Sequence, residues 1–291
     1  MNDGRFHRGW TRRRAALLLS AGLACFGANL KAAGRFRFAL TPVFLDNDAA
    51  VIDALATALE AGMGLPVELV QRRTYQEITG ALLDGTVDAA WTCGYPFVQH
   101  RDALTVLGVP TWRRRPLYQS YLIAGRDSGA TGLADLAGGV HAFSDPDSNS
   151  GFLVTASDLS RIGQTPERFF SRTIFTYGHR NVVRAVAGGL VQSGSVDGYV
   201  WETLAEREPD LTARTRILSR SEWLGFPPFV ARSDRTAEPA IAACRQALLG
   251  LGTSPEGAEA LRLLRLDGMI AARPGLYDGI AARMALLSAL R

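Results

Sequence analysis

The chain has 291 residues, of which 47% are hydrophobic and 21% are charged, so it can bury real cores and is not a disordered or low-complexity sequence. Its net charge of +4 is concentrated at the start, because residues 1–33 hold six of the 32 basic residues and one of the 28 acidic residues. The rest carries 26 bases and 27 acids. No nucleic-acid-binding surface is therefore expected, and the length favours two lobes or one large α/β domain.

The first 33 residues are typical of an export signal. Basic residues precede the apolar run Ala15 to Phe26, which is too short for a stable transmembrane helix of ~20 residues, and small residues follow it. The arginines that begin at Arg12 loosely resemble a twin-arginine signal. We predict a periplasmic protein. Lipid attachment at Cys25 and an uncleaved membrane anchor are the alternatives.

Beyond the signal, β-rich runs alternate with helical patterns, as is typical of α/β proteins with parallel strands. Thr74 with Glu77 three residues later is a capping-box pattern that starts a helix. In chain order, the expected elements are a strand at 35–40, a helix at 47–63, a strand at 67–71, a helix at 75–83 and a strand at 87–91.

An extended stretch at 117–124 leads into a second alternation of strands and helices. Its expected elements are strands at 140–143, 172–177 and 196–200, helices at 151–160 and 181–192, a returning strand at 216–219 and a mostly helical remainder from 240 to 290. This pattern predicts a two-lobed α/β protein in which each lobe is a mostly parallel sheet flanked by helices. The predicted divisions are 1–33 for the signal, 34–124 for the first part of lobe 1, 125–220 for lobe 2 and 221–291 for the second part of lobe 1.

Five motifs, in order, resemble those of the periplasmic phosphonate-, phosphite- and phosphate-binding proteins of ABC transporters. The motifs are Thr74-Tyr75, residues 85–91 (GTVDAAW), residues 145–152 (DPDSNSGF), Gly178-His179, and residues 194–198 (GSVDG) followed by Trp201-Glu202. The resemblance runs from about residue 38 to residue 232. It implies the type II periplasmic-binding fold, a ligand cleft between the lobes, no catalysis, a monomer, and a permease in the inner membrane as the partner.

The segment Ser148, Asn149 and Ser150 is predicted to bind the ligand. Asp145-Pro146 favours a turn, and the next helix is expected to begin here, so hydroxyls and free backbone N–H groups would converge on one point. Such a helix start attracts an anion. The resemblance makes these three residues the cradle of the oxyanion. The alternative is a helix cap that binds nothing.

Four further site residues come from the resemblance. It implies that His179 donates a hydrogen bond to the oxyanion, and that Tyr75 and Tyr95 close over the ligand from the first lobe. Tyr199 aligns with a carboxylate that relatives use to hold an ammonium group, so a ligand without an amine is expected unless Glu202 substitutes. Each of these residues could instead be an ordinary core or surface residue.

The predicted function is the substrate-binding component of an ABC importer for a small phosphorus oxyanion, with no cofactor. Beyond the signal, Cys93 and Cys244 are expected to be buried and unpaired, and no Cys/His spacing suggests a metal site. A sensory module that reports to a membrane receptor is one alternative. A phosphoester hydrolase that uses Ser150 and His179 is another, although the chain has no Gly-x-Ser-x-Gly elbow.

Overall fold

The computed structural model describes residue 1, residues 34–41 and residues 49–288, and residues 35–291 form one compact unit. The predicted export signal and the alternative lipid site at Cys25 lie outside the described residues, so both stay predictions. Among the helices of the described ranges, none combines the length and the apolar character that a membrane crossing requires.

The first sheet has six strands in the order β13-β4-β12-β3-β1-β2. Its strands β2, β1 and β3 run parallel to one another, whereas β12, β4 and β13 join antiparallel. The strands are β1 (Phe36–Leu40), β2 (Val67–Gln71), β3 (Ala89–Trp91), β4 (Leu104–Thr111), β12 (Phe229–Arg232) and β13 (Gly268–Ile270).

The second sheet has five strands in the order β10-β6-β9-β7-β8, and only its β9-β7-β8 part is parallel. The strands are β6 (Ser120–Gly125), β7 (Val140–Phe143), β8 (Arg172–Phe175), β9 (Ser193–Asp197) and β10 (Thr215–Arg220). Both sheets are therefore mixed, which corrects the expectation of mostly parallel sheets. The strands that carry the chain between the sheets pair antiparallel with their neighbours.

The chain crosses between the two sheets at a short antiparallel pair. Strand β5 (Leu117–Tyr118) pairs with β11 (Leu224–Gly225), and each leads directly to or from the neighbouring pair β6 and β10. Residues 122–124 lie inside β6 and pair with strands on both sides. The predicted lobe boundaries at residues 125 and 221 stay a proposal. Strand β6 of the second sheet already begins at Ser120, before the first of these boundaries.

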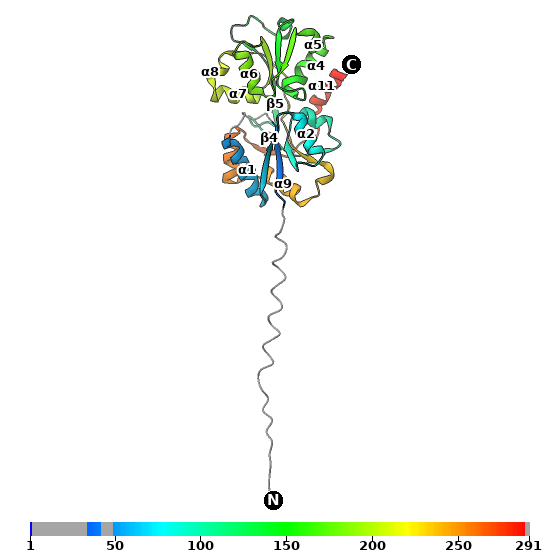
Figure 1. The fold of residues 1–291 in the computed structure, drawn as a ribbon, viewed down its shortest axis with the longest axis vertical. Helices are drawn as coiled ribbons and strands as arrows, with labels where there is room; N and C mark the ends of the chain where they lie inside the picture. The colour runs from blue at the N-terminus through cyan, green and yellow to red at the C-terminus, as the bar shows by residue number, and fades with distance from the viewer. Residues whose placement is uncertain (2–33, 42–48, 289–291) are drawn as a thin grey trace. The chain divides into compact units, whose positions relative to one another are not determined.

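Helices cover both sheets. In Figure 1, α4 to α8 gather around the five-stranded sheet, whereas α1, α2 and α9 gather around the six-stranded sheet. Helix α11 contacts both α3 and α4. The helices are α1 (Ala49–Met63), α2 (Tyr75–Leu83), α3 (Gly94–Gln99), α4 (Val154–Ser160), α5 (Pro166–Phe169), α6 (His179–Ala187), α7 (Gly198–Arg207), α8 (Pro209–Thr212), α9 (Pro239–Leu249), α10 (Pro255–Leu263) and α11 (Asp278–Ser288), with single turns η1 (Leu133–Leu136), η2 (Asn149–Leu153), η3 (Ser233–Arg235) and η4 (Leu251–Thr253).

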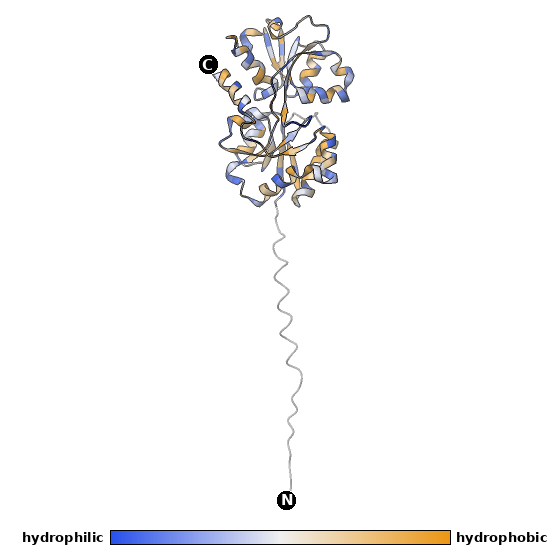
Figure 2. Cartoon of the chain, turned by 180° about the vertical axis from the view of Figure 1, so that it is seen from behind, coloured by the Kyte–Doolittle hydropathy of each residue, from blue (hydrophilic) through white to orange (hydrophobic). Residues whose placement is uncertain are grey.

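Alternation along the strands builds a core on each face of the first sheet. Phe38 of β1 packs with α1 on one face, whereas its neighbour Ala39 packs with Ile78 of α2 on the other. Trp91 and Phe229 stack with ring centroids 4.5 Å apart. Figure 2 shows that the helices carry both hydrophilic and hydrophobic residues, as expected for helices with one face on a core.

Several predicted elements match the structure, whereas β4, β12 and β13 of the first sheet were not predicted and two site residues lie in other elements than expected. Strands 67–71 and 140–143 and helix 75–83 have the predicted bounds. The strand predicted at 196–200 ends instead at Asp197, whose carboxylate caps α7, so Tyr199 lies in a helix. His179 is the first residue of α6 and not a loop residue.

Candidate ligand-binding site

The Ser148–Ser150 segment forms a tight, buried turn. Ser148 caps it by accepting a hydrogen bond at Oγ from the N–H of Gly151 (2.9 Å), and the five residues that follow Ser148 make one π-helical turn that runs into α4. The three side chains are at most 1% exposed. A Cβ on Gly151 would lie 1.8 Å from Ser144 Oγ, so only glycine fits there. π-Helical turns of this kind are frequent at functional sites.

This turn meets a residue beside the first sheet, a residue of the crossing strand β5 and a residue of β6. The backbone N–H of Asn149 donates to Cys93 Sγ (3.2 Å), and its side-chain Nδ2 donates to the hydroxyl of Tyr118 (2.8 Å). Cys93 lies directly after β3 as the N-cap of α3, and Tyr118 lies in β5. The Ser120 hydroxyl donates to the Ser150 carbonyl (2.6 Å) and holds the turn against β6. Residues far apart in the sequence therefore converge on the predicted cradle.

A second contact between the two sheets brings in Tyr75. Its backbone N–H, the first of α2, donates to Asp145 Oδ2 (3.2 Å), and the other carboxylate oxygen accepts from the N–H of Asp147 (2.8 Å). Tyr75 is 2% exposed. The predicted capping box is present, since Thr74 accepts from the N–H of Glu77 (3.1 Å). The start of α2 is thus held toward the segment that leads into the cradle.

His179 and Asp197 form a buried pair. The N–H of Asp197 donates to His179 Nδ1 (3.1 Å), so in a neutral ring the proton resides on Nε2, which becomes a hydrogen-bond donor. Burial lowers the pKa of His179 to about 3 and raises that of Asp197 to about 7. The Asp197 carboxylate caps α7 by accepting from the N–H groups of Tyr199 and Val200. At neutral pH His179 is therefore an uncharged Nε2–H donor.

The electrostatics connect Asp197 to the cradle. Burial first, and to a smaller extent the negative charge of Asp197, raise the pKa of the Cys93 thiol to about 12. Burial, and then nearby Cys93, likewise raise the pKa of Tyr75 and of Tyr118, and Asp197 adds to both shifts. These phenols and this thiol are consequently neutral at physiological pH. Tyr75 and Tyr118 can each offer a hydroxyl without adding negative charge near an anion.

The remaining two predicted residues differ in their placement. The hydroxyl of Tyr199 donates to the carbonyl of Leu264, and its ring lies edge-on to Phe226 with centroids 5.3 Å apart. Tyr199 therefore directs its polar end to Leu264 and not to the cradle. Tyr95 is 8% exposed and lies one residue into α3, where its N–H bonds to Cys93 Sγ.

Comparison with known proteins decides the family. The family model for the periplasmic substrate-binding protein of phosphonate ABC transporters matches residues 38–277. The chain belongs to this family. A curated relative, the phosphate-import protein PhnD of Mycolicibacterium smegmatis, is 29% identical over 192 residues, which are 62% of this chain and 60% of the relative. The match thus spans less than two thirds of that relative's length.

Solved structures agree on the fold of this phosphonate-binding family member. A binding component of an ABC phosphonate transporter from Pseudomonas aeruginosa superimposes with a TM-score of 0.80 at 19% identity, over 88% of this chain and 87% of that one. PhnD1 from Prochlorococcus marinus, solved with methylphosphonate, gives 0.75 at 18% identity, over 87% and 98%. The predicted α/β, two-lobed type II periplasmic-binding fold and the family resemblance are confirmed.

Two residues of the family member's candidate site were missed by the sequence reasoning. Tyr118 lies in the stretch that was expected to be extended. The pattern that could have pointed to it is an aromatic residue two positions after Pro116, where the chain crosses between the lobes. Cys93 was expected only to be buried and unpaired, yet its sulfur accepts the N–H of Asn149. As expected, Cys93 and Cys244 are buried and unpaired.

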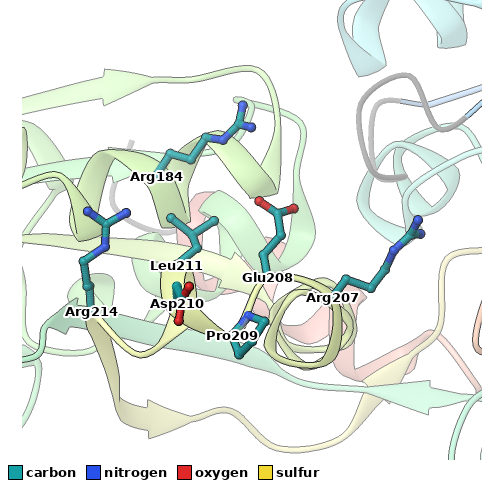
Figure 3. Close-up of a pocket in the computed structure, with 7 residues that line it drawn as sticks. All are labelled: Arg184, Arg207, Glu208, Pro209, Asp210, Leu211 and Arg214. Atoms are coloured by element: carbon teal, nitrogen blue, oxygen red, sulfur yellow. The ribbon is translucent and has the colours of Figure 1, made fainter.

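A separate pocket of about 510 Å³ lies among α6, α7 and α8, away from every predicted site residue. Figure 3 shows Arg184, Arg207 and Arg214 spread around Glu208 and Leu211. Glu208 is also paired with Arg180 (2.7 Å), which offsets its charge. The pocket is basic and open, and its residues can be changed without touching the cradle.

Proposed function

We propose that this protein is the substrate-binding component of an ABC importer and that its ligand is a small phosphorus oxyanion. The observation that carries the proposal is the buried polar turn Ser148–Ser150, whose Asn149 bonds to Cys93 beside the first sheet and to Tyr118 of the crossing strand β5. Just before the turn, Asp145 bonds to the N–H of Tyr75 at the start of α2. Membership of the phosphonate-binding family supports the same ligand class. Such a protein binds and releases its ligand and makes or breaks no covalent bond.

The site can hold an anion through neutral hydrogen-bond donors, without a positively charged side chain. The hydroxyls of Ser148 and Ser150 and the Nε2–H of His179 are neutral donors. Donors fixed in a buried place hold a negative charge well because little water competes for it. Tyr75 and Tyr95 would line the other wall. Tyr199, whose hydroxyl is bonded to Leu264, would support the wall through its ring.

The family also suggests where the protein acts. We place it in the periplasm, exported by residues 1–33 or tethered at Cys25, as a monomer that delivers its ligand to a permease in the inner membrane. In this scheme residues 34–124 and 221–291 form lobe 1, and residues 125–220 form lobe 2. The crossing at β5 and β11 lets the lobes part and close.

The test is calorimetric titration of the parent and two variants with phosphate, phosphite, methylphosphonate and aminoethylphosphonate. Ser150→Ala and His179→Ala each remove one hydrogen bond to a charged ligand, so each should weaken binding by about tenfold or more. Ser128→Ala, in the loop after β6, and Arg214→Ala, in the basic pocket, are the controls and should bind as the parent does. A parent that binds none of the four, or that hydrolyses a phosphoester, contradicts the proposal.

A further inference from the structure

Four buried polar atoms in the region of the cradle have no hydrogen-bond partner. Within the described part of the chain, they are Thr41 Oγ1, Thr92 Oγ1, Ser144 Oγ and Asn149 Oδ1, and their residues are at most 3% exposed. Buried polar side-chain atoms in native proteins nearly always have a partner, so each exception requires an explanation. Ser144 lies against Gly151 inside the turn, whereas the two threonines come from the side of the first sheet.

The two threonines are neighbours at one edge of the first sheet. Leu40 of β1 and Trp91 of β3 are paired in parallel register, and Thr41 and Thr92 are the next residue of each strand. The backbone of Thr92 still pairs like a strand, because its N–H donates to the carbonyl of Pro228 (3.0 Å). The two hydroxyls therefore lie at the carboxyl ends of parallel strands, where α/β proteins bind their ligands.

Strand alternation directs both threonines toward the start of α2. Ala39 and Ala90, two positions earlier, pack in the core that contains Ile78 and Leu82 of α2, and side chains two apart share a face. A helix that follows a parallel strand has its N-terminus at the carboxyl edge of the sheet. That N-terminus is Tyr75, whose N–H reaches Asp145 of the second sheet.

The unpaired Asn149 Oδ1 approaches the same place from the opposite side. The N–H of Asn149 donates to the sulfur of Cys93, which is the residue directly after Thr92. The unpaired amide oxygen of Asn149 and the unpaired hydroxyl of Thr92 thus belong to adjoining segments of opposite sheets. The cradle supplies donors on one side, and the threonines add two hydroxyls on the other.

We propose that Thr41 and Thr92 are ligand-binding residues that make the site selective for inorganic phosphate over alkylphosphonates. The inference rests on the proposed function. Phosphate presents four oxygens, so it can bond to hydroxyls from the first sheet while three oxygens face the cradle. A P–OH group can also donate to Asn149 Oδ1. Methylphosphonate would turn a methyl group toward one set of partners and leave them unpaired, which a buried polar site disfavours.

The variants Thr41→Val, Thr92→Val and the double variant test this inference, because valine keeps the shape and removes the hydroxyl. We expect the parent to bind phosphate at least about tenfold more tightly than methylphosphonate. The double variant should lose about tenfold or more for phosphate and change little for methylphosphonate, so the selectivity collapses. Thr92→Ser should keep it. Thr57→Val, on the exposed face of α1, is the matched control.

Thermal unfolding of the ligand-free variants separates binding from structure. A hydroxyl without a partner in the free protein stabilises nothing, so each Thr→Val variant should have a Tm equal to or above that of the parent. Addition of phosphate should raise the Tm less than in the parent. A lower Tm without phosphate, or unchanged selectivity in the double variant, overturns the inference. A parent that prefers methylphosphonate also overturns it, whereas a parent that binds no phosphorus oxyanion overturns the proposed function.

Discussion

Two histidines, His141 in β7 and His179 at the start of α6, are buried with no carboxylate of the described residues bonded to their rings. His141 is fully buried, and its ring nitrogens lie 2.7 Å from Ser193 Oγ and 2.9 Å from Ser195 Oγ. Burial lowers the pKa of both His141 and His179 to about 3. Hydroxyls can satisfy a neutral imidazole but cannot offset a positive charge. The folded protein therefore holds both rings neutral at pH values where the unfolded chain protonates them.

This difference predicts acid sensitivity. Stability from the two rings is complete above pH 6.5 and is lost as the pH falls toward 3, at about 1.4 kcal/mol per pH unit for each ring. His141→Gln keeps a polar group but cannot protonate. Urea unfolding at pH 7, 6 and 5 should show a smaller loss per pH unit in the variant than in the parent. Equal slopes would show that His141 is protonated in the folded protein.

Asp197 predicts the opposite pH dependence. Burial raises its folded pKa from 3.8 to about 7, so its contribution to stability is complete below pH 3.8 and declines as the pH rises toward 7. Asp197→Asn keeps the oxygen that accepts from the N–H groups of Tyr199 and Val200. Relative to the parent, the variant should gain stability between pH 4 and 7 and then level off. If the gap between the two unfolding free energies stays constant over this range, Asp197 is ionised at all these pH values.

At the scale of elements, local signals explain which predictions matched. The bounds of α2 follow from Thr74 and Glu77, which act within one turn of the chain. The stretch from Val196 to Val200 was predicted as a strand although Asp197 within it is a favoured helix N-cap residue. Its carboxylate accepts from the N–H groups of Tyr199 and Val200, which is a local contact that neighbouring residues could have indicated. Its own N–H bonds to His179, 18 residues earlier, and only this tertiary contact lay beyond a window of neighbouring residues.

Helix α11 provides a stability test. Arg283 is 3% exposed and bonds to both carboxylate oxygens of Glu222 (2.7 and 2.5 Å), to Asp158 (2.9 Å) and to Ser157 (2.7 Å). It therefore ties α11 to α4 and to the segment before β11. Arg283→Leu leaves Glu222 without this cation and Ser157 without its donor, while Asp158 keeps Arg161, and should lower the unfolding free energy by about 3 kcal/mol.

The matched control for Arg283 is Arg262→Leu on α10. Arg262 pairs with Glu259 at 2.6 Å, but both side chains are about half exposed or more, so its loss should cost at most about 1 kcal/mol. Urea titration followed by circular dichroism measures both variants. Equal effects of the two substitutions would contradict a special role for the buried arginine.

At the scale of the whole molecule, the sequence predicted the two-sheet plan and the cradle but not which parts of the first sheet meet it. Motifs located Ser148 to Ser150 because the turn and the helix start are local. The partner atom of Asn149 is Cys93 Sγ, 56 residues earlier, and that of its side chain is Tyr118. These contacts depend on how the two crossings at β5 and β11 set one sheet against the other. No local pattern encodes that arrangement.

The final prediction concerns closure about those crossings. The direct hydrogen bonds between the sheets, Asn149 to Cys93 and Tyr75 to Asp145, must break when the lobes part, and a ligand that bonds to both sides favours their re-formation. Solution scattering of residues 35–291 should therefore give a smaller radius of gyration with saturating phosphate than without it. The Ser150→Ala, His179→Ala double variant, which should bind weakly, is the control and should not change at the same phosphate concentration. If the parent binds phosphate by calorimetry while its scattering profile stays the same, the lobes do not move on binding and the crossing is not a hinge.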